Sequence, residues 1–199
     1  MSSPTDRQKV AVYCGSSGKC DARYLDEAAR TGTLLAQAGL GIVFGGGSTG
    51  LMGSVADAAL SVGGDVIGVM PRFMVDVEWA HAGLTDLRTV DSMHQRKQLI
   101  LDTSDAVVAL PGGCGTLEEL LEAITWKQLG LFTGPIVVVN YLGFYDLCLT
   151  MLESCIRERF MNPHHRDIWS VISSADGILA CLTDSPKWSE DALLRAPVE

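Results

Sequence analysis

The stretch Asp105-Ala-Val-Val-Ala-Leu-Pro-Gly-Gly-Cys-Gly-Thr-Leu-Glu-Glu119 decides the fold class of this chain. Residues 105–110 are apolar after the first position, which is typical of a strand that is buried on both faces of a parallel sheet. Proline and three glycines end this strand, and a helical pattern begins at Thr116. The stretch therefore predicts a strand, a tight turn and a helix, which is the repeating unit of α/β folds.

The same alternation continues on both sides of this unit. The sequence predicts further strands at 9–14, 41–44, 65–69, 85–90 and 135–140. It predicts helices at 22–37, 51–61, 92–103, 116–131, 144–159 and 174–181. Strands that alternate with helices are joined by right-handed crossovers, so we expect a doubly wound, Rossmann-like parallel sheet flanked by helices.

Length and composition indicate a single globular domain. The chain has 199 residues, of which 47% are hydrophobic and 20% charged, so it can bury one sizeable core. We expect one domain over residues 1–183 and a polar C-terminal tail over 184–199. The net charge of −9 argues against a nucleic acid or a membrane as partner. The absence of a long apolar segment, a signal pattern or a CxxC pair favours a soluble cytoplasmic protein with reduced cysteines and no metal.

Three glycine-rich turns follow predicted strands, at the edge of the sheet where doubly wound folds bind ligands. They are Cys14-Gly-Ser-Ser-Gly18, Gly45-Gly-Gly-Ser-Thr-Gly50 and Pro111-Gly-Gly-Cys-Gly-Thr116. The second turn matches the dinucleotide pattern GxGxxG and also the nucleophile pattern GxSxG around Ser48. Asp65 is badly placed to hold a ribose, which disfavours an NAD-dependent oxidoreductase. A tight turn that only lets a helix pack closely on the sheet remains an alternative.

The third turn has the composition of a phosphate cradle. Its glycines let a ligand approach the backbone, and a helix N-terminus offers free N–H groups and partial positive charge. A carboxylate one turn further on, at Glu118 or Glu119, suits cleavage at the anomeric carbon of a sugar phosphate. Thr116-Leu-Glu-Glu119 equally fits a capping box, in which Glu119 only completes the start of its own helix. The spacing alone leaves both interpretations open.

A second charged cluster, Met93-His-Gln-Arg-Lys97, begins a predicted helix that Ser92 caps. Met93, Arg96 and Ile100 share one helical face, so Arg96 is expected to point into the protein. An inward arginine needs an anion, which is either a buried carboxylate or the phosphate of a ligand.

Taken together, these stretches resemble the LONELY GUY (LOG) family, once labelled as lysine decarboxylases. The family is marked by PGGxGTxxE, and residues 111–119 meet every fixed position of this motif. The similarity continues through residues 14–17, 45–53, 66–71 and 124–126, and covers the chain from about Val10 to Ala180. LOG proteins are phosphoribohydrolases that release the base from nucleoside 5′-monophosphates, above all from cytokinin riboside monophosphates and often from AMP.

The resemblance implies a set of site residues. Glu119 and Arg96 are implied to be catalytic, and Lys97 to help bind the anion. The implied substrate contacts are Glu78, Arg96, Lys97, Gly112, Gly113, Cys114, Gly115, Thr116, Leu117, Glu118, Glu119 and Thr125. The other glycine-rich turns add Gly15, Ser16, Ser17, Gly45, Gly46 and Gly47 as nucleotide-loop candidates. Around Glu78 the sequence Val-Glu-Trp-Ala-His departs from the Glu-Leu-Thr that is usual in the family.

The resemblance also implies a homodimer, and the helix at 116–131, with its apolar end, is the candidate interface. No cofactor and no metal is needed for this chemistry. The rival reading is a module of the same fold that binds a nucleotide or a phosphorylated cofactor without cleaving it, as carriers of molybdenum cofactor do. The presence of both Arg96 and Glu119 favours the enzyme. A lysine decarboxylase has no mechanistic support, because that reaction normally needs a pyridoxal Schiff base.

Overall fold

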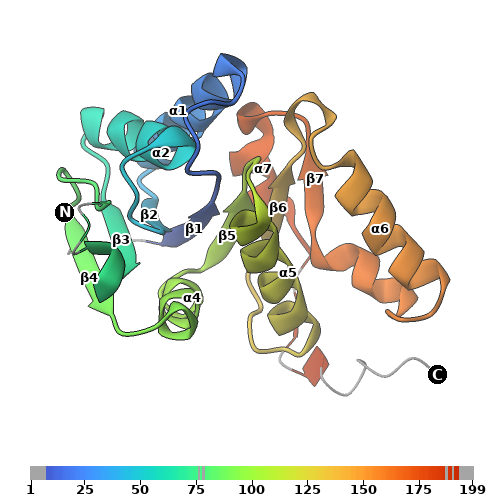
Figure 1. The fold of residues 1–199 in the computed structure, drawn as a ribbon. Coiled ribbons are helices and arrows are strands. Elements are labelled where there is room, and N and C mark those ends of the chain that lie inside the picture. Colours follow the sequence, from blue (N-terminus) through green and yellow to red (C-terminus); the bar gives the residue numbers. More distant parts are fainter. Residues whose placement is uncertain (1–7, 76, 78, 187, 190, 193–199) are drawn as a thin grey trace.

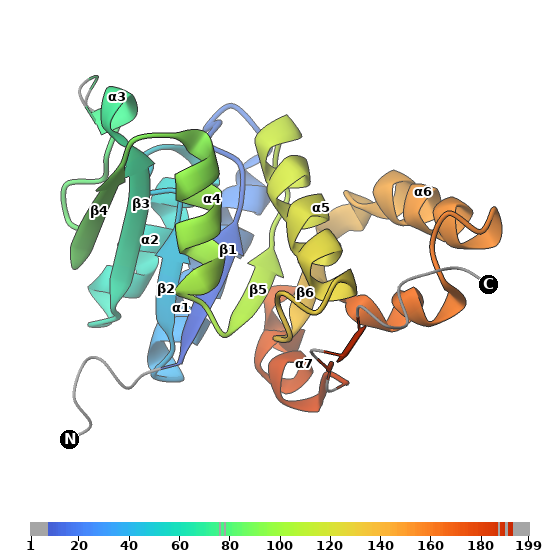
Figure 2. The ribbon, with the colours of Figure 1, turned by 90° about the horizontal axis from the view of Figure 1, so that it is seen from below.

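A computed structural model describes residues 8–75, 77, 79–186, 188–189 and 191–192. It contains one seven-stranded parallel sheet with the strand order β4-β3-β2-β1-β5-β6-β7, and helices cover both of its faces (Figures 1 and 2). The chain starts in the middle of the sheet, winds outward to β4 and then returns to build β5, β6 and β7 on the other side. This is a doubly wound sheet, so the predicted fold class is confirmed.

The elements follow the predicted alternation closely. The strands are β1 (Lys9–Tyr13), β2 (Gly41–Phe44), β3 (Val66–Pro71), β4 (Asp86–Val90), β5 (Ala106–Ala109), β6 (Ile136–Val139) and β7 (Ser170–Ile172). The α-helices are α1 (Ala22–Gln37), α2 (Gly50–Ser61), α3 (Arg72–Val75), α4 (Met93–Asp102), α5 (Cys114–Gln128), α6 (Asp146–Arg157) and α7 (Ile178–Asp184). The short elements β7 and α3 were not predicted, because three or four residues carry too little periodicity to be recognised.

The core lies in two layers, one on each face of the sheet. Val10 and Val12 of β1 pack with α1, α2 and α7, whereas Ala11 and Tyr13 pack with α4, α5 and α6. Successive strand residues point to opposite faces, so a strand covered on both sides must be apolar throughout. Between α1 and α2 the contact is so close that a Cβ on Gly32 would lie 2.2 Å from the carbonyl oxygen of Val55.

The middle of the sheet forms the crevice where ligands of doubly wound folds bind. The chain leaves the neighbouring strands β1 and β5 in opposite directions, so a gap opens beyond their carboxyl ends. The turns that follow these two strands touch there, because the N–H of Gly15 donates to the carbonyl of Pro111 at 3.0 Å. A Cβ on Gly112 would lie 2.8 Å from the nitrogen of Gly15, so this contact requires glycine.

Part of the C-terminal tail lies against the domain. The indole of Trp188 stacks on the ring of His164 and lies 5.7 Å from the ammonium of Lys127, and Ala192 is buried. Within the described residues, no helix combines the length and the apolar character that a bilayer span requires.

Candidate active site

The three glycine-rich turns line one cavity of about 670 Å³ at the carboxyl edge of the sheet. Arg96 of α4, Glu118 and Glu119 of α5 and several apolar side chains complete its lining. The cavity therefore lies at the crevice that the strand order creates. It brings together residues that are more than 100 positions apart in the sequence, from Cys14 to Glu119.

The N-terminus of α5 opens into this cavity. The N–H groups of Cys114, Gly115 and Thr116 have no acceptor within the described residues, and the first helical bond runs from Leu117 to the carbonyl of Gly113 at 3.1 Å. A Cβ built on Gly113 or Gly115 meets nothing within 4 Å, so both glycines face open space. Free N–H groups and the positive end of the helix make this turn a site for an anion such as phosphate.

The capping-box interpretation of Glu119 is wrong. Helix α5 begins at Cys114 with Gly113 as its N-cap, two residues earlier than predicted, and no side chain caps it. Thr116 is the third residue of the helix and is buried, so it does not start the helix. Glu119 lies in the second turn and does not complete the helix start. At α4, in contrast, the predicted cap is confirmed, since the hydroxyl of Ser92 accepts the N–H of Gln95 at 3.2 Å.

The turn before α2 is built differently from the turn before α5. The N–H groups of Leu51 and Met52 donate to the carbonyl of Gly15 at 3.0 and 3.3 Å, so the start of α2 is already occupied. Gly50 has a positive φ of 62°, and a Cβ there would lie 2.4 Å from the carbonyl carbon of Ser16. The tight-turn interpretation therefore accounts for this end of the GxGxxG stretch. The hydroxyl of Ser48 lies 3.4 Å from the carbonyl of Trp79, with no catalytic base bonded to it in the described structure.

Arg96 points into the protein, as predicted, and only 6% of its surface is exposed. Its Nε donates to the carbonyl of Val69 at 3.0 Å and its Nη2 to the carbonyl of Gly45 at 2.9 Å. A Cβ on Gly45 would lie 1.9 Å from Nη2, so position 45 must be glycine for the guanidinium to fit. Burial lowers the pKa of Arg96 and the charge of Glu119 opposes this, although no described carboxylate forms a salt bridge with the guanidinium. The site thus holds a cation with unused donor capacity.

Glu119 lies half-buried in the cavity lining and accepts no hydrogen bond from the described residues. Burial raises the pKa of its carboxyl to about 7, and the charge of Arg96 opposes this rise. Glu118 and Glu122 contribute smaller increases. A carboxyl with a pKa near 7 exchanges its proton readily at neutral pH, which is the property of a general acid or base.

Lys97, which the resemblance implies to help bind the anion, lies between two carboxylates of α5. Its ammonium is buried, lies 2.5 Å from the carboxylate of Glu118 and 3.2 Å from that of Glu122, and does not line the cavity. The hydrogen bond to Glu118 is the main cause of its raised pKa. Lys97 therefore ties α4, which carries Arg96, to α5, which carries Glu119.

The other expected residues divide into two groups. The cavity lining includes Gly15, Ser16, Gly45, Gly47, Gly113, Cys114, Gly115, Thr116 and Glu118. It does not include Ser17, Gly46, Gly112, Leu117 or Thr125. Thr125 lies further along α5 and donates its hydroxyl hydrogen to the carbonyl of Leu121 at 2.8 Å, while Leu117 packs against the core. Glu78 lies outside the described residues.

Sequence reasoning missed an apolar part of the cavity wall. It is formed by Met52, Met70, Met74, Trp79 and Met93. Of these, Met93 shares the helical face of Arg96 and was recognisable on that ground. The other four come from separate elements, and no sequence spacing links them.

Comparison with known proteins places the chain in a family. Residues 52–182 match the family model described as "Possible lysine decarboxylase". The chain is 40% identical over 177 residues to cytokinin riboside 5′-monophosphate phosphoribohydrolase LOG1 of Arabidopsis thaliana, covering 89% of this chain and 83% of the relative. It is 41% identical over 180 residues to the cytokinin riboside 5′-monophosphate phosphoribohydrolase of Rhodococcoides fascians, covering 90% of each.

A solved structure supports the fold alone. The molybdenum cofactor binding protein from the phototrophic bacterium Rippkaea orientalis superposes with a TM-score of 0.69 at 19% identity, covering 89% of this chain and 96% of that one. Identity this low says nothing about what this chain binds. The family match and the relatives at about 40% identity are decisive, and the chain belongs to the LOG family, whose model bears the lysine decarboxylase description.

Proposed function

We propose that this protein hydrolyses the N-glycosidic bond of nucleoside 5′-monophosphates, with cytokinin riboside 5′-monophosphates as favoured substrates and AMP as a further one. The observation that carries the proposal is the place of Glu119. Its carboxyl, with a pKa of about 7, shares one cavity with the free N-terminus of α5 and with Arg96. One cavity thus offers a phosphate site and a carboxylate for the anomeric carbon. The names of the curated relatives support the same reaction.

The phosphate determines how the substrate lies. The N–H groups of residues 114–116, which have no acceptor in the part of the chain that the structure describes, can hold the 5′-phosphate, and the partial charge of the helix favours the anion. Arg96 is already fixed by two carbonyls, so it needs little reorganisation to bind an anionic or hydroxyl oxygen of the substrate as well. With the phosphate held at the start of α5, the ribose extends toward Glu119 in the second turn of the same helix.

The chemistry needs only side chains and water. As the bond from the base to C1′ breaks, positive charge develops on the ribose, and the carboxylate of Glu119 stabilises that charge more in the transition state than in the ground state. A water molecule adds its oxygen to C1′ and gives up a proton, which ionised Glu119 can accept. The electron pair of the broken bond goes to the base nitrogen, which takes up a proton from solvent, and Glu119 later returns its proton to solvent, so that one water is consumed.

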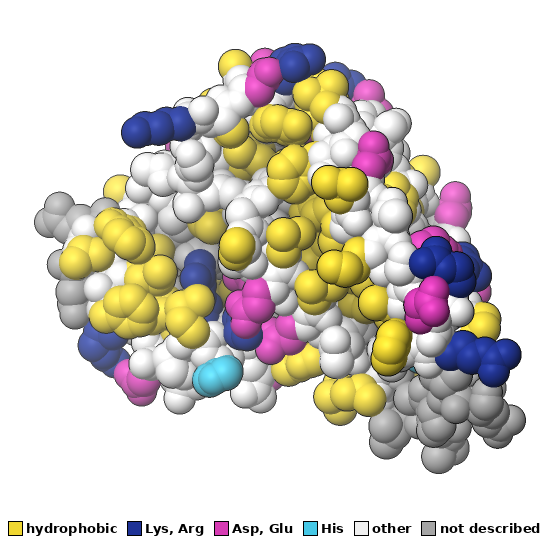
Figure 3. Space-filling view, turned by 45° about the vertical axis from the view of Figure 1, so that its right-hand side comes forward, with side chains coloured by type: hydrophobic (Ala, Val, Ile, Leu, Met, Phe, Trp, Pro, Cys, Tyr) yellow, Lys and Arg dark blue, Asp and Glu magenta, His cyan; other side chains and the backbone are white. Residues whose placement is uncertain are grey.

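We also propose that the enzyme acts as a homodimer in the cytoplasm. Helix α6 exposes 86% of Leu147 and 66% of Met151, and Leu121 of α5 is exposed as well. Figure 3 shows hydrophobic side chains gathered on the face that carries these helices. A second copy of this face would cover an apolar surface that water otherwise meets. All six cysteines are free thiols, which suits a reducing compartment.

The decisive experiment measures base release from AMP and from isopentenyladenosine 5′-monophosphate, with adenosine and isopentenyladenosine as controls. We expect release from both monophosphates and from neither nucleoside, because the nucleosides have nothing to bind at the N-terminus of α5. Equal release from nucleosides would contradict the phosphate site. No release from any monophosphate by folded protein would instead favour a binding module that does not cleave its ligand.

A further inference from the structure

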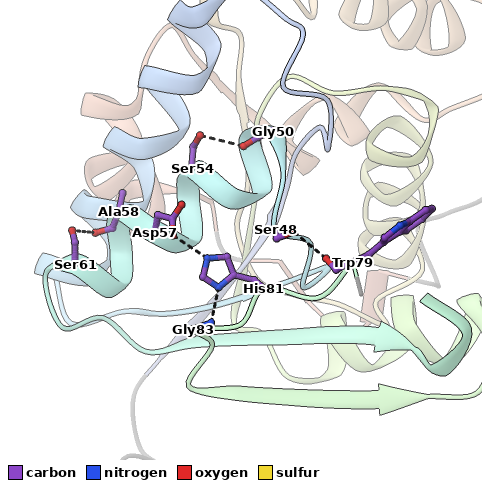
Figure 4. A network of polar contacts seen from close by, with 9 residues as sticks. All are labelled: Ser48, Gly50, Ser54, Asp57, Ala58, Ser61, Trp79, His81 and Gly83. Atoms are coloured by element: carbon purple, nitrogen blue, oxygen red, sulfur yellow. Dashed lines mark hydrogen bonds and ion pairs between the residues drawn. The ribbon is translucent and has the colours of Figure 1, made fainter. Parts of the chain in front are cut away.

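Trp79 is a large aromatic side chain that the chain leaves uncovered at the cavity. It lines the cavity, yet 57% of its surface is exposed. In Figure 4 its indole points away from the polar groups that hold its backbone. An exposed indole beside a ligand cavity offers a flat apolar face to that ligand.

The backbone of Trp79 is attached to the glycine-rich turn of the cavity. Its carbonyl accepts the N–H of Ser48 at 3.2 Å, and the N–H of His81 donates to the carbonyl of Gly46 at 2.9 Å. Between these two bonds, Gly47 and Ala80 form an antiparallel bridge. The segment that carries the indole is therefore held along the same turn that supplies Gly45 and Gly47 to the cavity wall.

The ring of His81 adds a third attachment, which we call the His81 latch. Its Nδ1 accepts the N–H of Gly83 at 3.1 Å, so the neutral ring carries its hydrogen on Nε2. Nε2 lies 3.0 Å from the carboxylate of Asp57 on α2 and donates to it (Figure 4). Only 11% of the His81 side chain is exposed, so the ring is shielded from water, whereas the Asp57 side chain is 75% exposed. The latch joins the segment to α2 independently of the backbone bonds at Ser48 and Gly46.

The base is the part of the substrate for which no contact has been named so far, and Trp79 is a candidate for that contact. The N-terminus of α5 takes the phosphate and Glu119 acts at the anomeric carbon, so the base must meet another part of the lining. Apart from the first two glycine-rich turns and Glu118, what remains is the apolar wall of Trp79 and four methionines. Methionine adapts its shape to irregular apolar groups, and an indole stacks on a purine ring.

We propose that Trp79 is a specificity-determining residue for the base and its apolar N6 substituent, and that His81 is the positioning residue that holds Trp79 in place. This inference rests on the proposed function. Trp79 takes no part in breaking the glycosidic bond, because the indole has no ionisable group. Its effect is therefore on KM and on the choice between bases, while kcat depends on Glu119 and Arg96.

The first test compares wild type with Trp79→Ala, Trp79→Leu and Trp79→Phe on AMP and on isopentenyladenosine 5′-monophosphate. Loss of stacking should raise KM about tenfold in the alanine variant, with the larger rise for the substrate with the apolar substituent. Phenylalanine should restore most of the affinity, and leucine should change the ratio of kcat/KM between the two substrates. Phe73→Leu is the matched control, because Phe73 is also 57% exposed but does not line the cavity.

The second test concerns the latch. His81→Leu removes both ring hydrogen bonds and should raise KM in the same direction as Trp79→Ala, with kcat much less affected. In a Trp79→Ala background the same change should have no further effect on the ratio between substrates. A merely structural His81 would instead lower stability and leave that ratio unchanged in both backgrounds, which would overturn its positioning role.

Binding without turnover keeps this inference separate from the proposed function. AMP titrated onto the protein should quench tryptophan fluorescence, and Trp79→Phe should abolish most of the quenching. This signal is expected even if no base is released, in which case only the proposed reaction fails. Unchanged quenching in Trp79→Phe, together with wild-type KM values in Trp79→Ala, would show that the base does not pack on Trp79.

Discussion

Two ionisable residues in the cavity differ in how firmly their surroundings hold them. The guanidinium of Arg96 is held by the carbonyls of Val69 and Gly45, whereas the carboxyl of Glu119 accepts no hydrogen bond from the described residues. Glu119 is therefore free to interact with substrate and water. Its proton equilibrium follows from burial, with Arg96 limiting the rise of its pKa.

Glu119→Gln tests the catalytic role directly. Glutamine keeps the shape of the side chain but can neither accept a proton nor offset positive charge, so we expect turnover to fall about 10²- to 10⁴-fold. Nucleotide affinity, measured by calorimetry with AMP, should change little. Glu122→Gln, on the same helix but outside the cavity lining, is the control and should lose far less activity. Similar losses in both variants would point to a general effect on α5.

The raised pKa of Glu119 predicts the pH dependence of activity and of stability. If ionised Glu119 is the active form, kcat/KM should rise with pH through about 7 and then level off.

The folded-state pKa of Glu119 lies above the unfolded value, so stability from protonated Glu119 is present at low pH and is lost as pH rises through 7. Glu119→Gln should therefore be more stable than wild type at pH 8, by about 1 to 3 kcal/mol. Near pH 4 denaturant melts of the two proteins should coincide.

At the scale of elements, the starts of α2 and α5 explain why similar glycine-rich turns differ in use. The first N–H groups of α2 bond to the carbonyl of Gly15, while those of α5 have no acceptor among the described residues and lie at the cavity. The ammonium of Lys97 lies between Glu118 and Glu122 and joins α4 to α5. Together these contacts place the start of α5 in the same cavity as Arg96.

Two glycine-to-alanine changes in helices should have opposite effects on stability. Gly115→Ala lies in α5 where a Cβ meets nothing, so it should stabilise the fold by about 0.5 to 1 kcal/mol while raising KM for AMP. Gly32→Ala in α1 places a Cβ 2.2 Å from the carbonyl of Val55 and should destabilise the protein by about 1 to 3 kcal/mol. Urea melts and steady-state kinetics separate the two outcomes. An unchanged KM in Gly115→Ala would exclude a phosphate at this turn.

At the scale of the whole molecule, the exposed apolar face of α5 and α6 is the surface through which we expect two copies of the protein to form a dimer. Leu147 and Met151 lie on one stripe of α6, four positions apart, and point away from the core. Their exposure on a helix that is otherwise packed against the sheet is what a subunit interface requires.

Met151→Glu should therefore shift the protein from dimer to monomer. A carboxylate on an apolar interface must be desolvated without a partner, which disfavours association strongly. Light scattering after size exclusion measures the mass. Met161→Glu is unsuitable as a control, because Met161 is partly buried outside α6 and a charge there would affect folding as well as assembly. Val171→Glu on β7, where valine is 45% exposed, is the better control. A wild-type protein that is monomeric at micromolar concentration would contradict this interface.

Local patterns in the sequence determined the α/β class, the positions of most strands and helices, and the inward face of Arg96. Apolar runs, helical spacing and the Ser92 cap are read from neighbouring residues, so they need no tertiary information. The start of α5 was predicted two residues too late, because Gly113 acts as N-cap through its backbone alone. The PGGxGTxxE motif indicated the site before its geometry was known.

Only the tertiary structure decided which helix end is free, where Lys97 finds its partners and what lines the apolar wall. Each of these depends on contacts between segments that are far apart in the chain, such as Gly15 with Leu51, or Lys97 with Glu118. The spacing of residues along a sequence determines which side chains share one face of a helix or strand. It does not determine which residues of another element contact that face. The physical reason is that hydrogen bonds and ion pairs act over a few ångströms in space, whatever the separation along the chain.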